Sequence, residues 1–367
     1  MRHGIIDRIK NGGRVTRDEA VELFKSDDLF IIGKLAAEVA ERRNSNNAYF
    51  IVNRHINPTN ICVNRCKFCA FSRSKDEEGA FELTIDQILQ RLSAGCENSQ
   101  TSYGPLKQCC SFSEVHIVGG LHPDWPFEHY VEMIAAIHQS FPRLNIKAFT
   151  AVEIDYFSRI SGLGLEEILL KLKESGLQIM PGGGAEIFAE GVRNQVCPEK
   201  ISGARWLEVM EIVHRVGIKT NATMLYGHVE TSEDRVDHLL KLRELQDKTE
   251  GFQAFISLAY HPKNTEIGGF YSSGIDDLKT IAISRLILDN FDHIKAYWIM
   301  LGEKISQTAL LFGADDLDGT IIEEKITHSA GAMTGEGMLR DDLIYLIRKA
   351  GKTPVERDGL YNEIWKG

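Results

Sequence analysis

Residues 60–71 read NICVNRCKFCAF, and the three cysteines in this run have the spacing C-x3-C-x2-C. Iron–sulfur clusters of the [4Fe–4S] type are usually bound by four thiolates, one on each iron. A loop that offers only Cys62, Cys66 and Cys69 leaves one iron without a protein ligand. That iron is open to a small molecule, so the run predicts a [4Fe–4S] centre with an open coordination site.

A zinc site and a structural role are the alternatives for these cysteines. His55 lies close enough in the sequence to be a fourth zinc ligand. Zinc sites usually pair two C-x2-C knuckles at a distance, however, and the sequence has no second knuckle. Three cysteines within eight residues, beside Asn, Arg and Lys, are also unlike core packing. The spacing therefore favours the cluster.

The chain of 367 residues with 43% hydrophobic residues can bury a large core. Periodic apolar segments run through most of it without a Pro/Ser-rich linker, which favours one principal domain with appendages. We expect an N-terminal helical segment at 1–50, a barrel core at 51–313 and a C-terminal extension at 314–367 that completes or covers the barrel.

Charge and hydropathy restrict the partners and the location. A net charge of −10 argues against nucleic acid, which needs a basic face. No run of about 18 uncharged apolar residues predicts a membrane span. The first residues lack the apolar core of a signal peptide, and thiolates reserved for a cluster need a reducing compartment. We therefore expect a cytoplasmic protein.

From residue 51 onward, strands alternate with glycine-bearing loops and helices. Such alternation predicts an α/β fold with parallel strands, right-handed crossovers and a TIM-type barrel that is complete or nearly complete. The active site of such a barrel lies at the C-terminal ends of its strands. The expected strands are 51–57, 114–118, 145–152, 177–180, 218–225, 252–258 and 296–301, and the expected helices include 127–140, 164–175 and those capped by Thr16, Thr84, Ser202 and Thr231.

Several residues that can support chemistry follow these strands. Gly119-Gly120 follows the second strand, where missing side chains let a ligand approach the backbone. The run 181–186, PGGGAE, matches neither a Walker A loop nor a Rossmann fingerprint, and its glycines suggest close approach by a bulky group. His228 and Glu230 follow another strand as a candidate acid, base or anion binder, and a purely structural hydrogen-bonded histidine is the alternative.

The cysteine spacing resembles that of the radical S-adenosylmethionine (SAM) superfamily, in which SAM chelates the open iron of the cluster. Within it, the chain is similar to the aminodeoxyfutalosine synthases of the futalosine route to menaquinone. Their relatives, the dehypoxanthine futalosine cyclases and the deazaflavin-forming synthases of coenzyme F420 biosynthesis, share much of the pattern. The similar segments are NRHINPTNIC (53–62), HIVGGLHP (116–123), KAFTAVEI (147–154), MPGGGAEIF (180–188), NATMLYGHVET (221–231) and GADDL (313–317).

The resemblance implies a radical transferase. A 5′-deoxyadenosyl radical from SAM adds to the enolpyruvyl group of 3-[(1-carboxyvinyl)oxy]benzoate, giving aminodeoxyfutalosine, methionine and bicarbonate. It also implies a flavodoxin- or ferredoxin-type reductant, and a homodimer is a further expectation. The expected cluster ligands are Cys62, Cys66 and Cys69, the expected SAM contacts are Gly119, Gly120, His122, Glu153, Gly183 and Glu186, and the expected catalytic residues are His228, Glu230 and Arg235.

Two functions outside this reaction class remain as alternatives, an iron–sulfur electron carrier and a zinc-stabilised binding module. A carrier prefers four protein ligands and needs no cavity beside the open iron. One stretch departs from the family pattern. Residues 95–112 look like a Ser-, Gln- and Cys-rich insertion, for which we expect a surface loop rather than a second metal site. Cys197 is expected to be structural.

Overall fold

The computed structural model describes residues 3–94, 112–322, 325–335 and 337–367. One sheet contains every strand in these ranges, in the order β11-β10-β1-β9-β8-β7-β6-β5-β4-β3-β2. All neighbouring strands are parallel except β10 and β11. The strands are β1 (Asn47–Ile51), β2 (Asn53–Ile56), β3 (Glu114–Ile117), β4 (Asn145–Ala148), β5 (Ile179–Met180), β6 (Lys219–Tyr226), β7 (Phe252–Ala259), β8 (His293–Lys295), β9 (Asp316–Gly319), β10 (Thr353–Arg357) and β11 (Glu363–Lys366).

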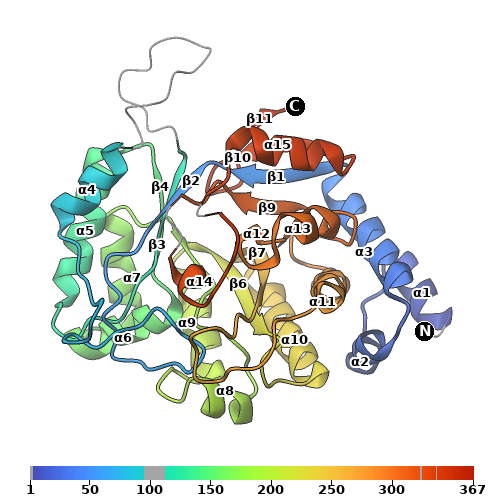
Figure 1. The fold of residues 1–367 in the computed structure, drawn as a ribbon, viewed down its shortest axis with the longest axis horizontal. Helices are drawn as coiled ribbons and strands as arrows, with labels where there is room; N and C mark the ends of the chain where they lie inside the picture. The colour runs from blue at the N-terminus through green and yellow to red at the C-terminus, as the bar shows by residue number, and fades with distance from the viewer. Residues whose placement is uncertain (1–2, 95–111, 323–324, 336) are drawn as a thin grey trace.

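Strands β2 to β9 curl into a nearly complete barrel, with helices on the outside (Figure 1). Just beyond β9, the chain returns to β2, where the His55 N–H donates to the Ile322 carbonyl at 3.1 Å. A parallel bridge between Arg54 and Ile322 marks the same closure. The expected α/β fold with a TIM-type parallel barrel is thus confirmed.

Most of the helices lie outside the sheet, where α2 packs beside α10 and α11, α3 beside α11, and α1 beside α3, whereas the short α14 lies over the barrel interior in this view (Figure 1). None of the helices in the described ranges is both long and apolar enough to span a bilayer. They are α1 (His3–Lys10), α2 (Arg17–Lys25), α3 (Leu29–Asn44), α4 (Ile85–Ala94), α5 (Phe127–Ser140), α6 (Ala151–Ser161), α7 (Leu165–Glu174), α8 (Glu190–Val196), α9 (Gly203–Arg215), α10 (Ser232–Thr249), α11 (Gly274–Ile287), α12 (Trp298–Leu301), α13 (Glu303–Ala309), α14 (Ile326–Ser329) and α15 (Arg340–Lys349).

Local capping chemistry sets where many of these helices begin. Thr16 and Thr231 close capping boxes at the starts of α2 and α10, as their spacing predicts. Ser202 accepts from the Arg205 N–H at the start of α9, and Thr84 accepts from the Gln87 N–H before α4. These four predicted helix starts are confirmed.

Three predicted strands have different bounds in the structure. Residues 145–152 do not form one strand, because Thr150 caps α6 and the strand ends at Ala148. The apolar run 296–301 is not a strand. After Ala296 the chain forms the short helix α12. The prediction was wrong because the residue pattern of a short, buried apolar run does not distinguish a strand from a helix. The first strand, expected at 51–57, is β2 at 53–56, which pairs with β3. A further strand, β1 at 47–51, precedes it and pairs with β9 and β10, so the end of the segment expected to be helical (1–50) is a strand instead.

The segment between β10 and β11 closes the N-terminal end of the barrel. The Gly359 N–H donates to Asn145 Oδ1 at 2.9 Å, and Gln253 donates to the Gly359 carbonyl. Arg357 is paired with Asp316 at 2.8 Å. Ligand access is therefore through the opposite end, where the strands finish. The division of the chain at residues 50 and 313 stays a prediction, and the structure adds that β9 lies within the curled sheet.

Candidate active site

Hydrogen bonds to three neighbouring loops hold the cysteine loop across the C-terminal end of the barrel. The Val63 N–H donates to the Leu121 carbonyl at 3.0 Å. The Lys67 N–H donates to Val196 at 2.9 Å, and the Lys67 carbonyl accepts from Glu266 at 2.8 Å. These bonds tie the loop to the segments that follow β3, β5 and β7, so its position is fixed by the barrel.

Gly119 and Gly120 bring the loop after β3 against the cysteine loop. A Cβ on Gly119 would lie 2.9 Å from the Thr59 carbonyl oxygen. The Gly120 N–H donates to the same carbonyl at 3.0 Å. From the sequence, these two glycines are predicted to contact SAM. Both do line the cavity described below, and the structure adds that they make room for the backbone that carries Cys62.

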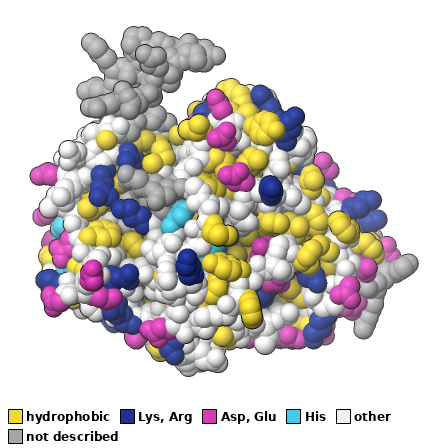
Figure 2. Space-filling model, viewed as in Figure 1, with side chains coloured by type: hydrophobic (Ala, Val, Ile, Leu, Met, Phe, Trp, Pro, Cys, Tyr) yellow, Lys and Arg dark blue, Asp and Glu magenta, His cyan; other side chains and the backbone are white. Residues whose placement is uncertain are grey.

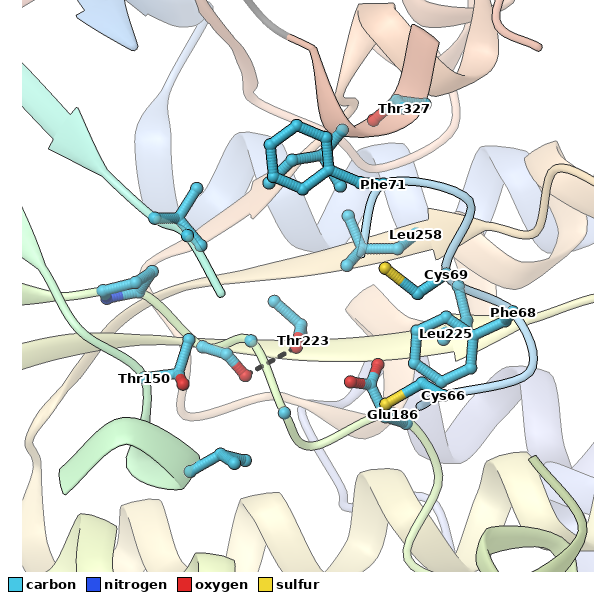
Figure 3. Close-up of a pocket in the computed structure, with 18 of the residues that line it drawn as sticks. Cys66, Phe68, Cys69, Phe71, Thr150, Glu186, Thr223, Leu225, Leu258 and Thr327 are labelled. Carbon is cyan, nitrogen blue, oxygen red and sulfur yellow. Dashed lines mark hydrogen bonds between the residues drawn. The ribbon is translucent and has the colours of Figure 1, made fainter. Parts of the chain in front are cut away.

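A cavity of about 320 Å³ opens beneath the cysteine loop and continues into the barrel. Figure 3 shows Cys66 and Cys69 beside Phe68 at one end, with Thr150 on the opposite side. Much of the wall is apolar, which favours exclusion of water from a bound ligand. The apolar lining residues include Phe68, Phe71, Val118, Leu225, Ile256 and Leu258.

The three cysteines all line this cavity. Burial raises the pKa of Cys66 to about 12 and also raises the pKa of Cys62. Ligation to iron therefore releases protons from these thiols. Within the described ranges, no group of three His, Cys, Asp or Glu side chains is arranged around a single metal ion. A [4Fe–4S] cluster needs no such convergence, because each thiolate binds a different iron. The donor set and the adjoining cavity fit a cluster with one open iron.

A buried ion pair borders the cavity beside Cys66. The Lys200 ammonium contacts Glu186 Oε1 at 2.5 Å and lies 4.9 Å from the centre of the Phe68 ring. Burial acts to raise the pKa of Glu186, yet the Lys200 charge holds it below its usual value. The Glu186 carboxylate is therefore ionised at neutral pH, and Figure 3 shows it next to Cys66.

Glu153 and Gly183 line the cavity where α6 begins, and each lies beside Thr150. The Thr150 N–H donates to Glu153 Oε2 at 2.7 Å, which closes the capping box of α6. Burial raises the pKa of Glu153 to about 7. A Cβ on Gly183 would lie 3.0 Å from Thr150 Cγ2, so this glycine keeps room beside the cap.

The inner end of the cavity is polar and is built from register partners on three strands. His55 on β2 is opposite His116 on β3, and His116 is opposite Lys147 on β4. All three line the cavity, as does Asp318 at the end of β9. Among these, sequence analysis named only His55. A signal was present, because Asn53/His55, Glu114/His116 and Asn145/Lys147 place polar residues at alternate positions of three strands, with apolar residues between them in β3 and β4 and Arg54 between them in β2.

Four predicted site residues are not among those that line the cavity: His122, His228, Glu230 and Arg235. His122 donates from Nε2 to Glu82 at 2.9 Å, while its Nδ1 accepts from the Asp124 N–H at 3.1 Å. The SAM contact predicted for His122 therefore has no support in this geometry.

The other three hold the loop between β6 and α10. Glu230 accepts from the backbone N–H groups of Gly227 and His228 and contacts Arg235 at 2.8 Å. Arg235 also reaches Asp276 at 2.8 Å. Burial lowers the pKa of His228. Since the charges of Glu230 and Arg235 are paired with each other and with Asp276 on α11, the geometry gives them a positioning role, and their predicted catalytic role is not supported by a contact with the cavity.

Comparison with known families decides the class of this site. Residues 56–242 match the model of the radical SAM superfamily, and residues 249–365 match that of the CofH/MqnC C-terminal region. The chain belongs to the radical SAM superfamily. It is therefore a radical SAM enzyme, and the [4Fe–4S] cluster and SAM implied by the superfamily fit the cysteine loop and its cavity.

Individual relatives within the superfamily carry different activities. The chain is 42% identical to an aminodeoxyfutalosine synthase of Thermus thermophilus, covering 98% of this chain and 95% of the relative. It is 38% identical to a cyclic dehypoxanthine futalosine synthase of Streptomyces coelicolor, with 98% and 88% covered. It is also 38% identical to a 5-amino-6-(D-ribitylamino)uracil–L-tyrosine 4-hydroxyphenyl transferase of Methanococcoides burtonii, with 96% of each covered.

A solved structure shares the fold of this radical SAM enzyme. Methylornithine synthase superposes with a TM-score of 0.74 at 16% identity, covering 95% of this chain and 97% of the other. At this identity the likeness concerns the fold alone.

Cys96, Cys109 and Cys110, in the predicted insertion, lie outside the described residues.

Proposed function

We propose that this enzyme is an aminodeoxyfutalosine synthase. In the proposed reaction, the 5′-deoxyadenosyl group of SAM is joined to the enolpyruvyl carbon of 3-[(1-carboxyvinyl)oxy]benzoate. The products are aminodeoxyfutalosine, methionine and bicarbonate, and the reaction consumes SAM and water. The observation that carries the proposal is that the three cysteines and the barrel interior share one largely apolar cavity. The 42% identity to a synthase over nearly the whole chain supports the choice of reaction.

A bound [4Fe–4S] cluster supplies the one-electron reduction that cleaves the C–S bond of SAM. In this proposal, Cys62, Cys66 and Cys69 hold the cluster at the mouth of the barrel. Gly119 and Gly120 expose backbone groups beside it, and the Glu186 carboxylate offers acceptors for hydroxyl groups of the adenosyl ribose. A flavodoxin or ferredoxin of the cytoplasm would provide the electron.

The apolar wall has a separate task. Leu225, Ile256 and Leu258 are among the apolar side chains that line the cavity. The reacting carbons must approach to about 3–3.5 Å in a dry site. Side chains without donors or acceptors keep water from competing for a reactive carbon, and they place the alkene by shape.

The two other activities of the relatives are the competing proposals, because their identities are only slightly lower. A dehypoxanthine futalosine cyclase would yield a cyclised product and no adenosine adduct. A 4-hydroxyphenyl transferase would need tyrosine and a ribitylaminouracil. Substrate choice separates all three.

The deciding experiment is an anaerobic assay. The protein is reconstituted with iron and sulfide, reduced, and supplied with SAM and the enolpyruvyl benzoate, and mass spectrometry follows the products. We expect a single compound that contains both the adenosyl and aryl groups. A Cys66→Ala variant should lose it, whereas Cys197→Ala, at a cysteine outside the predicted ligand set, should retain it. Release of 5′-deoxyadenosine without the adduct would overturn the proposed substrate.

A further inference from the structure

The inner end of the cavity contains a buried ammonium group. Lys147 points into the barrel from β4 and lines the cavity, although its side chain is only 4% exposed. Its Nζ lies 2.6 Å from Glu114 Oε1. An ammonium has three N–H donors, and Glu114 takes one of them. A ligand in the cavity therefore meets a cation that is already fixed in position.

His116 provides a second polar atom beside this lysine. Its Nε2 is buried and, among the described residues, has no hydrogen-bond partner. Burial lowers the pKa of His116 well below its usual value, and the nearby Lys147 charge acts in the same direction. The imidazole is therefore neutral, with one N–H to donate. A buried polar atom without a partner is costly, and a bound acceptor removes that cost.

The charges around this site are balanced before a ligand enters. In the described barrel interior, Lys147 is paired with Glu114, Lys295 with Asp318 at 3.4 Å, and Arg357 with Asp316 at 2.8 Å. Asp318 also lines the cavity, but Lys295 offsets its charge. An incoming anion thus meets local donors without facing a net negative interior.

The face of the molecule shown in Figure 2 has no large area of positive charge that would attract anions. Figure 2 shows acidic and basic side chains interspersed over the face that it presents, with hydrophobic side chains between them. Broad attraction of an anion needs a large area of one sign of charge. On this face, the groups suited to an anionic ligand are therefore the few polar side chains of the cavity.

We infer that Lys147 and His116 form a carboxylate-binding site at the inner end of the cavity, and that it holds the aromatic carboxylate of the substrate. This inference rests on the proposed function. The substrate has two carboxylates, and the one on the enolpyruvyl group must stay with the reacting carbon near the cysteine end. The carboxylate on the ring is the distant one. A fixed ammonium and a neutral N–H are suitable partners for it.

The test compares two ligands on the reconstituted holoenzyme with SAM and without reductant, so that no turnover occurs. One ligand is 3-[(1-carboxyvinyl)oxy]benzoate, and the other is (1-carboxyvinyl)oxybenzene, which lacks only the aromatic carboxylate. Calorimetric titration gives both dissociation constants. The wild-type enzyme should prefer the dicarboxylate by roughly 10- to 100-fold, as expected for a charge-assisted hydrogen bond.

Variants then assign that preference to residues. Lys147→Met/Glu114→Gln removes the ion pair as a whole, which avoids leaving a lone buried carboxylate. It should bring the two dissociation constants close together. Arg357→Met/Asp316→Asn removes another buried pair whose residues do not line the cavity, and it should keep the wild-type preference. His116→Leu should reduce the preference by roughly 3- to 10-fold, while His238→Leu, at a buried histidine that does not line the cavity, should not.

Each outcome decides the matter. Equal affinity of the wild-type enzyme for both ligands overturns the inference, as does a preference that survives in Lys147→Met/Glu114→Gln. If that variant does not fold, the wild-type comparison and the two histidine variants decide. If the adduct forms in the anaerobic assay but the preference does not depend on Lys147 or His116, only this inference fails. If no adduct forms and neither ligand binds, the proposed function fails with it.

Discussion

Gly120 lies so close to Ile61 that a Cβ built on the glycine would be 2.1 Å from the Ile61 carbonyl oxygen. The same Cβ would be 3.0 Å from Cys62 Cβ. No side chain fits there unless the backbone moves, because the obstacle is a peptide group. The path of the cysteine loop therefore depends on a glycine that lies far from it in the sequence.

We predict that Gly120→Ala displaces the cysteine loop. Overpacking of this kind typically costs about 1–3 kcal/mol of unfolding free energy. The iron and sulfide bound per chain after anaerobic reconstitution should fall as well, because Cys62 moves with its neighbours. Chemical iron analysis and urea unfolding measure the two effects.

Gly191→Ala is the matched control for this substitution. Gly191 lies in α8, where a new Cβ would meet no atom of the described residues within 4 Å. The iron content of Gly191→Ala should equal that of the wild type, and its unfolding free energy should rise by up to about 1 kcal/mol because alanine favours the helix. Full iron loading of Gly120→Ala would show that the loop does not need this close contact.

The Lys200–Glu186 pair leads to a second prediction. Their side chains are 15% and 7% exposed, so removal of either charge leaves its partner in a poorly solvated place. Lys200→Met should lower the unfolding free energy by about 3–5 kcal/mol. Lys200→Met/Glu186→Gln should lose much less, because no charge is left unpaired. The unfolding free energies of the wild type, Lys200→Met, Glu186→Gln and the double variant give the coupling energy of the pair. If the loss in the double variant equals the sum of the losses in the two single variants, the two charges do not stabilise each other.

The cysteine loop and the barrel could be predicted because both depend on patterns local in the sequence. The spacing of Cys62, Cys66 and Cys69 predicts a cluster site. The alternation of capped helices with apolar strands predicts a parallel β-sheet built from strand–helix–strand units. The site formed by His116 and Lys147 depends instead on the register between strands, which no local pattern determines. Polar residues at alternate strand positions were the available clue.

The residues after β6 show a different limit of the sequence. His228 and Glu230 follow a strand, as active-site residues of barrels do, but a local pattern cannot say whether such side chains point into the barrel. The turn at Gly227, with φ +88°, lets the chain fold back so that Glu230 accepts from its own loop. Arg235 then completes an ion pair with it, outside the cavity lining.

Glu153 gives a prediction about pH. Its pKa is raised by burial from 4.5 in the unfolded reference to about 7 in the folded chain. The folded state therefore holds the proton more tightly, so this group's contribution to stability is complete below pH 4.5 and is lost as the pH rises to about 7. Between pH 5 and 8 the loss amounts to about 2–3 kcal/mol. Glu153→Gln, which cannot ionise, should gain stability relative to the wild type by this amount over that range.

Glu19 provides the control for the pH experiment. It closes the same type of capping box on α2, but at the surface. Burial acts to raise its pKa, yet hydrogen bonds from Thr16 and the charge of Arg8 hold the pKa below its ordinary value. Glu19 is therefore ionised above pH 5 in both the folded and the unfolded chain. The difference in unfolding free energy between Glu19→Gln and the wild type should then not change with pH. A flat difference for Glu153→Gln as well would refute the raised pKa.

Tyr361 tests the closure at the N-terminal end of the barrel. Its hydroxyl donates to Asp316 Oδ2 at 2.7 Å, and the Arg357 guanidinium lies 4.0 Å from the centre of its ring. Tyr361→Phe keeps the ring but removes a hydrogen bond to a charged group, so the unfolding free energy should fall by about 1.5–3 kcal/mol. Tyr345→Phe removes the same hydroxyl from an exposed residue on α15 and should change stability by less than about 0.5 kcal/mol. Equal effects of the two substitutions in urea unfolding would mean that the segment between β10 and β11 does not stabilise the barrel through this contact.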